Sequence, residues 1–167
     1  MTTRKRADIV LVERGIFESR AQAQSAIKAG LVSVDGEPLR KTSGTIAPDA
    51  RITAEKPHPY VSRGGVKLAA ALDAFGIDPA GLVACDLGAS TGGFSDVLLQ
   101  RKAAKVYAVD VGHGQLHPRI AADARVVAME GRDARSLDRD VIAEPVDLVV
   151  ADVSFISMRL VIPPVIP

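Results

Sequence analysis

The sequence is poor in cysteine and aromatic residues and has no long apolar run. Its single cysteine, Cys85, cannot form an internal disulfide and lies in an apolar stretch that predicts a small buried residue. No stretch reaches the roughly 18 apolar residues of a membrane helix, and the opening MTTRKRADIV lacks the apolar core of a signal peptide. Three dispersed histidines and one cysteine make no metal site. These absences exclude a disulfide scaffold and favour a cytoplasmic protein.

The composition predicts a packed globular chain with an uneven charge distribution. Of its 167 residues, 47% are hydrophobic and 25% charged, as in ordinary soluble domains. The net charge of +1 hides a split, since residues 1–60 carry a net +3 and the remainder a net −2. The basic end is therefore a candidate for contact with a polyanion.

The amino-terminal residues combine two helical patterns with a hairpin signal. In ADIVLVERG, apolar residues recur near the helical period and Gly15 provides a C-terminal stop. In SRAQAQSAIKAG, Ser19 is a suitable N-cap and Gly30 a second stop. LVSVDGEPL then places apolar residues around an Asp35-Gly36 turn. We therefore predict a small α+β unit with two helices followed by short strands.

This order of elements resembles a small RNA-binding module first seen in a ribosomal protein of the small subunit. The resemblance rests on RADIVLVERG, SRAQAQSAIKAGLVSVDG and the Lys41 that follows. It implies that exposed cations meet RNA phosphates, where they release counterions. The candidates are Arg4, Arg6, Arg14, Arg20, Lys28 and Lys41. Charges alone are also typical of a solvated helix surface. Without an aromatic stripe for base stacking, structured RNA is the better target.

A proline-containing segment separates this unit from the rest. EKPHPYVSRGG holds two prolines and two glycines, and proline keeps a chain extended and stiff. We therefore divide the chain into an RNA-binding module at residues 1–55, a semi-rigid linker at 56–63 and a second domain at 64–167.

Beyond residue 82, strand-like and helix-like stretches alternate as in a doubly wound, Rossmann-like α/β fold. We expect strands at 82–87, 105–111, 125–130 and 147–153, with helices at 94–102 and 136–144 between some of them. DLGASTGGFS, residues 86–95, follows the first strand, where such folds bind ligands. Gly88, Gly92 and Gly93 are expected to leave its backbone open to a ligand.

The spacing of these glycines narrows the choice of ligand. A P-loop needs Gly-Lys-Ser/Thr and the dinucleotide fingerprint needs G-x-G-x-x-G, whereas this chain has G-x-x-x-G-G. A nucleoside with an amino-acid tail and no phosphates fits better, which indicates S-adenosylmethionine.

Asp110 supports this cofactor. It lies 22 residues after Gly88 at the end of the second strand, where a carboxylate can accept hydrogen bonds from ribose hydroxyls. Taken separately, the loop is also typical of a tight turn and the carboxylate of a solvated strand end. Asp133 is a weaker candidate for the adenine edge and is equally suited to cap a helix. The candidate cofactor residues are Asp86, Gly88, Ser90, Gly92, Gly93, Phe94, Asp110 and Asp133.

Four further motifs resemble the TlyA family, the haemolysin A proteins that methylate cytidine 2′-hydroxyls of ribosomal RNA. They are VSRGGVKL, DLGASTGGFSDVLL, AVDVGHGQL and DLVVADVSFIS, and with the amino-terminal module they cover essentially the whole chain. The resemblance implies an FtsJ-like catalytic domain with a lysine, aspartate, lysine and glutamate set, whose first two members map onto Lys67 and Asp152. A lysine tuned by a carboxylate and by burial can steer a ribose hydroxyl and help its proton leave. By themselves, Lys67 is typical of a surface helix and Asp152 of a loop cap.

The rest of that set has no counterpart, because residues 153–167 contain no Lys or Glu. We therefore expect a fragment of a longer protein, with the methyltransferase domain incomplete at its C-terminus and inactive alone. The leading hypothesis is methylation of ribosomal RNA, with ribosomal RNA or ribosomal subunits as partners. The alternative is an RNA-binding protein whose Rossmann-like half is a scaffold. A membrane-lytic function is disfavoured by the absence of a membrane helix and of aromatic anchors.

Overall fold

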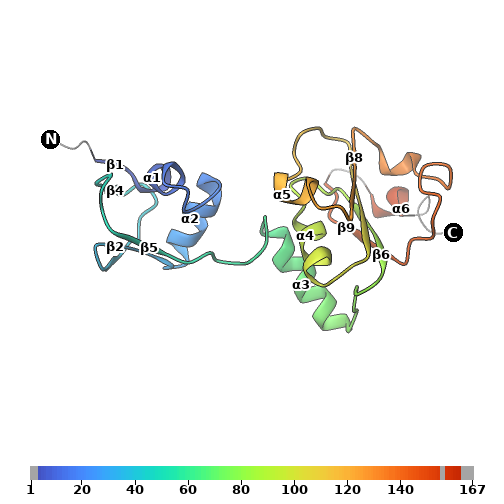
Figure 1. The fold of residues 1–167 in the computed structure, drawn as a ribbon, viewed down its shortest axis with the longest axis horizontal. Coiled ribbons are helices and arrows are strands. Elements are labelled where there is room, and N and C mark those ends of the chain that lie inside the picture. The colour runs from blue at the N-terminus through green and yellow to red at the C-terminus, as the bar shows by residue number, and fades with distance from the viewer. Residues whose placement is uncertain (1–3, 155–156, 163–167) are drawn as a thin grey trace. The chain divides into compact units, whose positions relative to one another are not determined.

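The computed structural model describes residues 4–154 and 157–162 of the chain. Two compact units are present, Met1–Pro59 and Tyr60–Pro167, and both can be followed in Figure 1 by the colour of the ribbon. None of the described helices has both the length and the apolar character of a membrane span.

Within residues 4–59, the amino-terminal unit forms two helices and five short strands. Its elements are β1 (Lys5–Arg6), α1 (Ala7–Glu13), α2 (Arg20–Lys28), β2 (Val32–Val34), β3 (Glu37–Pro38), β4 (Thr45–Ile46) and β5 (Ile52–Ala54). Strand β1 pairs with β4, and β2 lies between β3 and β5, all antiparallel. The two helices and the hairpin predicted from the sequence are confirmed.

Local signals in the sequence account for these elements. The Ser19 side chain accepts a hydrogen bond from the Gln22 amide at 3.3 Å and so caps α2. Gly30 follows that helix with a φ of 74°, and Asp35 and Gly36 in the hairpin turn have φ values of 52° and 88°. Two successive positive φ angles match the twist of a tight hairpin.

The carboxy-terminal unit is built on a four-stranded parallel sheet. Its elements are α3 (Gly64–Phe75), β6 (Val83–Leu87), α4 (Gly93–Gln100), β7 (Lys105–Asp110), α5 (Pro118–Ala121), β8 (Val126–Glu130), a 3₁₀ turn (Ala134–Ser136), β9 (Leu148–Ala151) and α6 (Met158–Val161). The strand order is β8-β7-β6-β9. All four predicted strands form, and the expected small α+β module followed by a Rossmann-like sheet is confirmed.

The helix predicted at residues 136–144 is wrong. After the 3₁₀ turn the chain runs without regular structure to β9. The Asp138 carboxylate accepts hydrogen bonds from the amides of Asp140 and Val141, both at 3.0 Å, and this stabilises a turn where the helix would continue. Leu137 and Ile142 are nevertheless buried in the core. An irregular segment, and not a helix, carries them.

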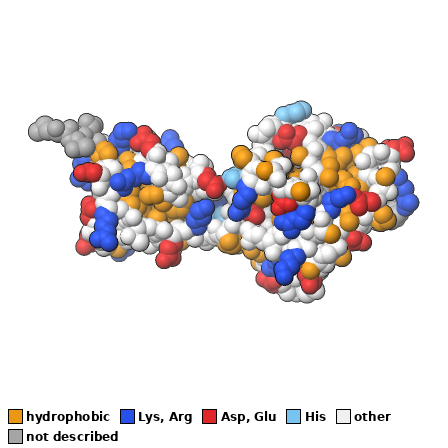
Figure 2. All heavy atoms as spheres, in the orientation of Figure 1, with side chains coloured by type: hydrophobic (Ala, Val, Ile, Leu, Met, Phe, Trp, Pro, Cys, Tyr) orange, Lys and Arg blue, Asp and Glu red, His pale blue; other side chains and the backbone are white. Residues whose placement is uncertain are grey.

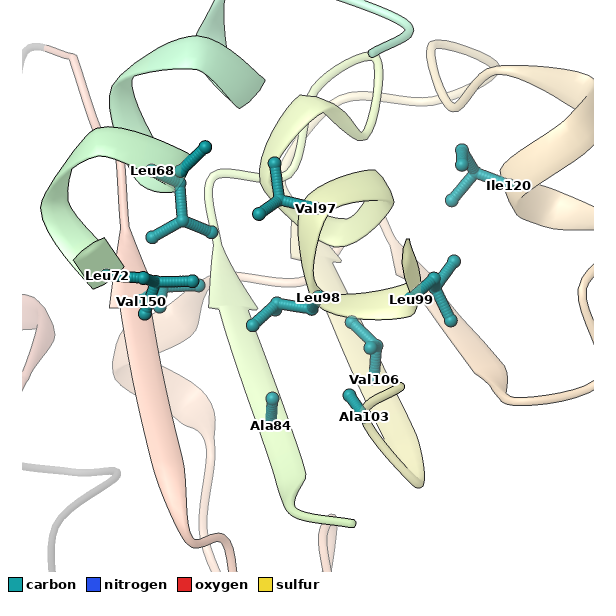
Figure 3. Close-up of a cluster of buried hydrophobic side chains, with 11 residues drawn as sticks. Leu68, Leu72, Ala84, Val97, Leu98, Leu99, Ala103, Val106, Ile120 and Val150 are labelled. Atoms are coloured by element: carbon teal, nitrogen blue, oxygen red, sulfur yellow. The ribbon is translucent and has the colours of Figure 1, made fainter. Parts of the chain in front are cut away.

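Alternate residues of the strands face two separate cores, as a doubly wound sheet requires. On one face, helices α3 and α4 cover Ala84, Val106 and Val150, and Figure 3 shows their leucines and valines packed over the strands. On the other face, Cys85, Leu87 and Tyr107 pack with the segment after the 3₁₀ turn. The predicted burial of Cys85 is confirmed, and burial is the main cause that raises the pKa of its thiol to about 12.

Candidate cofactor and catalytic site

Three carboxylates lie at the carboxyl ends of neighbouring strands. Asp86 lies near the end of β6, Asp110 ends β7 and Asp152 directly follows β9. Since β6 lies between β7 and β9, this edge is the crevice where open α/β sheets bind ligands. A cavity of about 400 Å³ opens here, within the size range of small-molecule sites. It is lined by Gly88, Ser90, Val109, Asp110, Val111, Gln115, Arg132, Asp133, Ala134, Arg135, Asp152, Val153, Ser154 and Val161.

The glycine-rich loop is held against the end of β7. The amides of Gly88 and Ala89 both donate to the Val109 carbonyl, at 2.9 and 3.1 Å. The Ser90 amide donates to Asp110 Oδ2 at 2.7 Å. Ser90 adopts a φ of 48°, a left-handed conformation uncommon outside glycine. These contacts fix the loop so that Gly88 and Ser90 face the cavity.

The three glycines of this loop differ in what surrounds them. A Cβ at Gly88 would lie 3.0 Å from the Asp152 carbonyl oxygen, beside the cavity. One at Gly92 would lie 2.8 Å from Leu116 Cδ1, and one at Gly93 would overlap the Ser62 hydroxyl. Gly92 and Gly93 are thus required for packing within the protein. Neither lines the cavity, and the expectation that they leave the backbone open to a ligand stays a prediction.

Phe94 and Asp86 also lie outside the cavity lining. Phe94 packs against the core under α3 and α4. Asp86 is buried, and its Oδ2 accepts hydrogen bonds from the Ser95 amide at 2.9 Å and the Ser95 hydroxyl at 2.7 Å. Its Oδ1 has no hydrogen-bond partner among the described residues. Burial, with smaller contributions from Asp110 and Asp152, raises the pKa of Asp86 to about 6.

Asp110 combines firm anchoring with spare acceptor capacity. Its Oδ1 accepts the Gly112 amide at 2.8 Å, while Oδ2 accepts that of Ser90. A carboxylate offers about four lone-pair sites, so each oxygen can accept a further hydrogen bond. Asp110 lines the cavity, and its carboxylate can therefore hold a hydroxyl-bearing ligand there.

Lys67 and Asp152, separated widely in sequence, meet at the same edge. Lys67 Nζ donates to Asp152 Oδ2 at 3.2 Å. Lys67 lies in the first turn of α3, and Asp152 both lines the cavity and packs its backbone against Gly88. The burial expected around the lysine is not observed, because its side chain is 68% exposed.

Asp133 lines the cavity but is already occupied. Its carboxylate caps the 3₁₀ turn by accepting the Arg135 amide at 2.9 Å, and it also pairs with the Arg135 guanidinium. That pairing lowers the pKa of Asp133 to about 2. The helix-capping interpretation is thus the one that the structure displays for this residue.

The six amino-terminal cations are all exposed but differ in their contacts. Arg4 donates to the Thr45 carbonyl at 2.7 Å and Arg14 to the Ala50 carbonyl at 2.5 Å, so both support the fold. Arg6 and Arg20 converge on Asp8. Among the described residues, Lys28 and Lys41 have no side-chain partner. Figure 2 shows Lys and Arg side chains at several places on the visible face of this unit.

Comparison with protein families identifies the unit that carries the cavity. Residues 60–166 match the model of the FtsJ-like methyltransferases. The chain belongs to the FtsJ-like methyltransferase family. A second family model, the S4 domain, matches residues 5–52, ahead of the FtsJ-like part.

Individual relatives are similar to the chain along most of its length. It is 47% identical over 165 residues to the 16S/23S rRNA (cytidine-2′-O)-methyltransferase TlyA of Mycobacterium tuberculosis, which covers 98% of the chain and 62% of the relative. It is 40% identical to Hemolysin A of Brachyspira hyodysenteriae, covering 95% of the chain and 66% of the relative. The resemblance to the TlyA family is thereby confirmed. The chain spans about three fifths to two thirds of the length of these relatives.

A solved structure is also similar to the chain, in both sequence and fold. A hemolysin candidate from Streptococcus thermophilus superposes with a TM-score of 0.67 at 38% identity, covering 99% of this chain and 62% of the other. The arrangement of the FtsJ-like domain described above is therefore shared with a solved structure of related sequence.

Sequence reasoning missed several residues of the FtsJ-like cavity. Gln115 faces it from the loop after β7, with its side-chain oxygen 3.3 Å from the Ser90 hydroxyl. Val111 also lines it and is 68% exposed. Both follow Asp110 in VGHGQL, so the loop after a predicted binding residue was the available signal. No cluster of potential metal ligands occurs within residues 4–154 and 157–162.

Proposed function

We propose that this protein transfers a methyl group from S-adenosylmethionine to a cytidine ribose 2′-hydroxyl of ribosomal RNA. Residues 1–55 would hold the RNA, residues 56–63 connect the two parts, and residues 64–167 contribute the cofactor and catalytic site. The observation that carries the proposal is the contact between Lys67 and Asp152, at 3.2 Å, on the rim of a cavity lined by Gly88 and Asp110. A substrate of this kind also places the protein in the cytoplasm.

The residues present fit the proposed cofactor. Gly88 lines the cavity and has a φ of 79°, a conformation that favours glycine, so its backbone borders the space where a ligand would lie. Asp110 would accept hydrogen bonds from ribose hydroxyls. Ser90, which also lines the cavity, is a further candidate for contact with this cofactor. S-adenosylmethionine, when bound, supplies a methyl group on a sulfonium that needs no further activation.

Lys67 and Asp152 would place the attacking hydroxyl. An ammonium has three N–H donors, and one of them is used by Asp152. The remaining donors can orient a ribose oxygen toward the cavity, while Asp152 keeps the lysine at the rim. Correct placement would supply much of the rate enhancement of methyl transfer. Holding the ribose hydroxyl in line with the methyl donor replaces a bimolecular encounter by a reaction within one complex.

The amino-terminal unit supports an RNA substrate through its match to the S4 domain and its net charge of +3 over residues 1–60. Cations on a small folded unit hold phosphates without reading bases. Choice of nucleotide would then depend on where the rim places the hydroxyl.

Transfer of tritium from labelled S-adenosylmethionine to ribosomal RNA, measured with the longer protein that we expect to contain this chain, tests the proposal. Lys67→Met and Asp152→Asn should each lower transfer at least tenfold, with cofactor affinity changed much less. Asp140→Asn is a matched control, because Asp140 is exposed on the same unit and should leave transfer unchanged. Undiminished transfer in both site variants would contradict the catalytic assignment. RNA binding without cofactor binding in the wild-type chain would instead favour the scaffold alternative.

A further inference from the structure

One buried carboxylate joins two exposed arginines of the amino-terminal unit. Asp8, in the first turn of α1, is fully buried. Its Oδ1 accepts Arg6 Nε and its Oδ2 accepts Arg6 Nη2, both at 3.0 Å, in a two-nitrogen contact. The same Oδ2 accepts Arg20 Nη2 at 2.9 Å. Gln24, one turn further along α2, donates to it at 2.7 Å.

This arrangement satisfies the carboxylate and leaves both arginines incompletely used. Hydrogen bonding from Arg6 is the largest cause that holds the pKa of Asp8 well below its usual range, with Gln24 and Arg20 adding to it against the effect of burial. The side chains of Arg6 and Arg20 are 45% and 54% exposed. A guanidinium has five N–H donors. Within the described part of the chain, the Nη1 group of each arginine makes no hydrogen bond to another residue.

Two guanidiniums brought to one carboxylate make a pre-formed anion site. Alone, the two cations would repel each other and explore many rotamers, and both costs would fall on the binding step. Asp8 offsets the repulsion and fixes the two planar groups before a ligand arrives. Their remaining N–H donors then suit the oxygens of a phosphate, which arginine binds with two parallel hydrogen bonds.

We propose that Asp8 is a positioning residue that orients Arg6 and Arg20 to grip one phosphate of the RNA backbone. The inference rests on the proposed binding of ribosomal RNA by the amino-terminal unit. The inference assigns phosphate contact to Arg6 and Arg20, and it assigns their orientation to the buried Asp8, which does not itself contact the RNA.

A model in which only net charge matters and the proposed positioning role predict opposite changes in RNA affinity for Asp8→Asn. The variant gains one positive charge, so a non-specific electrostatic surface would bind RNA more tightly. Positioning predicts binding about tenfold weaker, because the arginines lose their shared anchor. Glu13→Gln is the matched control, since it adds the same charge on α1 by removing an exposed partner of Lys5. It should bind RNA as tightly as the wild type or more tightly.

A second variant keeps the carboxylate and every charge. Arg20→Lys retains the positive charge but cannot present a planar fork, and we expect RNA binding about three- to tenfold weaker. Arg40→Lys, at an exposed arginine of the same unit, should have no effect. Affinities for a ribosomal RNA fragment are compared in the full chain at one salt concentration, with urea unfolding of each variant to correct for the folded fraction.

The outcomes separate this inference from the function on which it rests. Weaker binding by both Asp8→Asn and Arg20→Lys, with both controls unchanged or tighter, supports the positioning role. If Asp8→Asn fails to fold, Arg20→Lys against Arg40→Lys decides. Unchanged or tighter binding by a folded Asp8→Asn overturns the inference and leaves RNA binding standing. A wild-type chain that binds no RNA overturns both.

Discussion

Asp86 is held under conditions that are unfavourable for a charged carboxylate. It is buried beneath the glycine-rich loop, accepts hydrogen bonds only from Ser95 among the described residues, and has two other carboxylates nearby. Burial of a charge costs free energy unless partners compensate. Keeping this carboxylate buried with few partners therefore lowers the stability of the unit.

This arrangement predicts an unusual pH dependence. Because the pKa of Asp86 is raised from 3.8 to about 6 in the folded protein, the folded state keeps a proton that the unfolded chain loses first. Its contribution to stability is greatest below pH 4 and falls as pH rises through 6, by up to about 3 kcal/mol. Urea unfolding of the wild type and of Asp86→Asn is measured at several pH values. As the pH rises, the free energy of unfolding of the wild type should fall relative to that of the variant. A constant difference from pH 4 to pH 7 would contradict this.

Asp110 should control affinity for the cofactor. We expect Asp110→Ala to weaken S-adenosylmethionine binding by about 1.5–3 kcal/mol, the usual loss for hydrogen bonds to a charged group. Asp110→Asn keeps one acceptor oxygen and should lose less. Titration calorimetry measures both, with Asp140→Ala on the same unit as the control. If all three variants bound S-adenosylmethionine as tightly as the wild type, Asp110 would be excluded as a residue that binds this ligand.

At the scale of elements, helices α3 and α4 come close together where each contains a glycine. Gly93 begins α4 and faces Ser62, and a Cβ there would also lie 3.1 Å from the Gly65 amide in α3. The same contact brings the first turn of α3, which holds Lys67, to the edge of the sheet. Close helix packing and placement of the proposed catalytic lysine therefore depend on the same small residues.

Gly93→Ala should destabilise the carboxy-terminal unit by about 1–3 kcal/mol, the usual cost of overpacking. Ser62→Ala removes the hydroxyl that the new methyl group would meet. The double variant should therefore recover part of the loss, although the Gly65 amide remains close. Chemical unfolding of the two single variants and the double variant gives the coupling energy. Strict additivity would show that the Ser62 contact is not the cause.

Elements with strong local signals were predictable from the sequence, and those determined by tertiary contacts were not. Ser19, Gly30 and the Asp35-Gly36 turn act within a few residues, so the helices and hairpin of the first unit follow from the chain itself. At residues 136–144 the predicted helix does not form, because the Asp138 side chain accepts hydrogen bonds from nearby backbone amides. Periodicity records which residues are buried and not which backbone presents them.

The candidate site shows the same division. Asp110, Gly88 and Asp152 lie where their positions after strands predicted. The roles of Gly92 and Gly93 could not be read from spacing, because Leu116 and Ser62 approach them from elsewhere in the fold. The contact of Lys67 with Asp152 spans 85 positions, and only the family resemblance connected the two residues.

At the scale of the whole molecule, charge is divided between the two units, and this division should be visible in binding. Lys28→Gln with Lys41→Gln removes two exposed cations that hold no other side chain among the described residues. RNA affinity should fall and its log-log salt slope should become shallower by about 0.7–0.9 for each phosphate that is no longer neutralised. Affinity for S-adenosylmethionine should stay the same. An unaltered salt slope would make these lysines part of the solvated surface.

The gathering of Asp86, Asp110 and Asp152 at one edge of the sheet also bears on how a spent ligand would leave. A sulfonium donor is positive at sulfur, and methyl transfer turns it into a neutral thioether. A negative edge attracts the first species more strongly than the second. The proposed reaction would therefore weaken the hold on its own by-product. Added salt should narrow the difference in affinity between S-adenosylmethionine and its demethylated form.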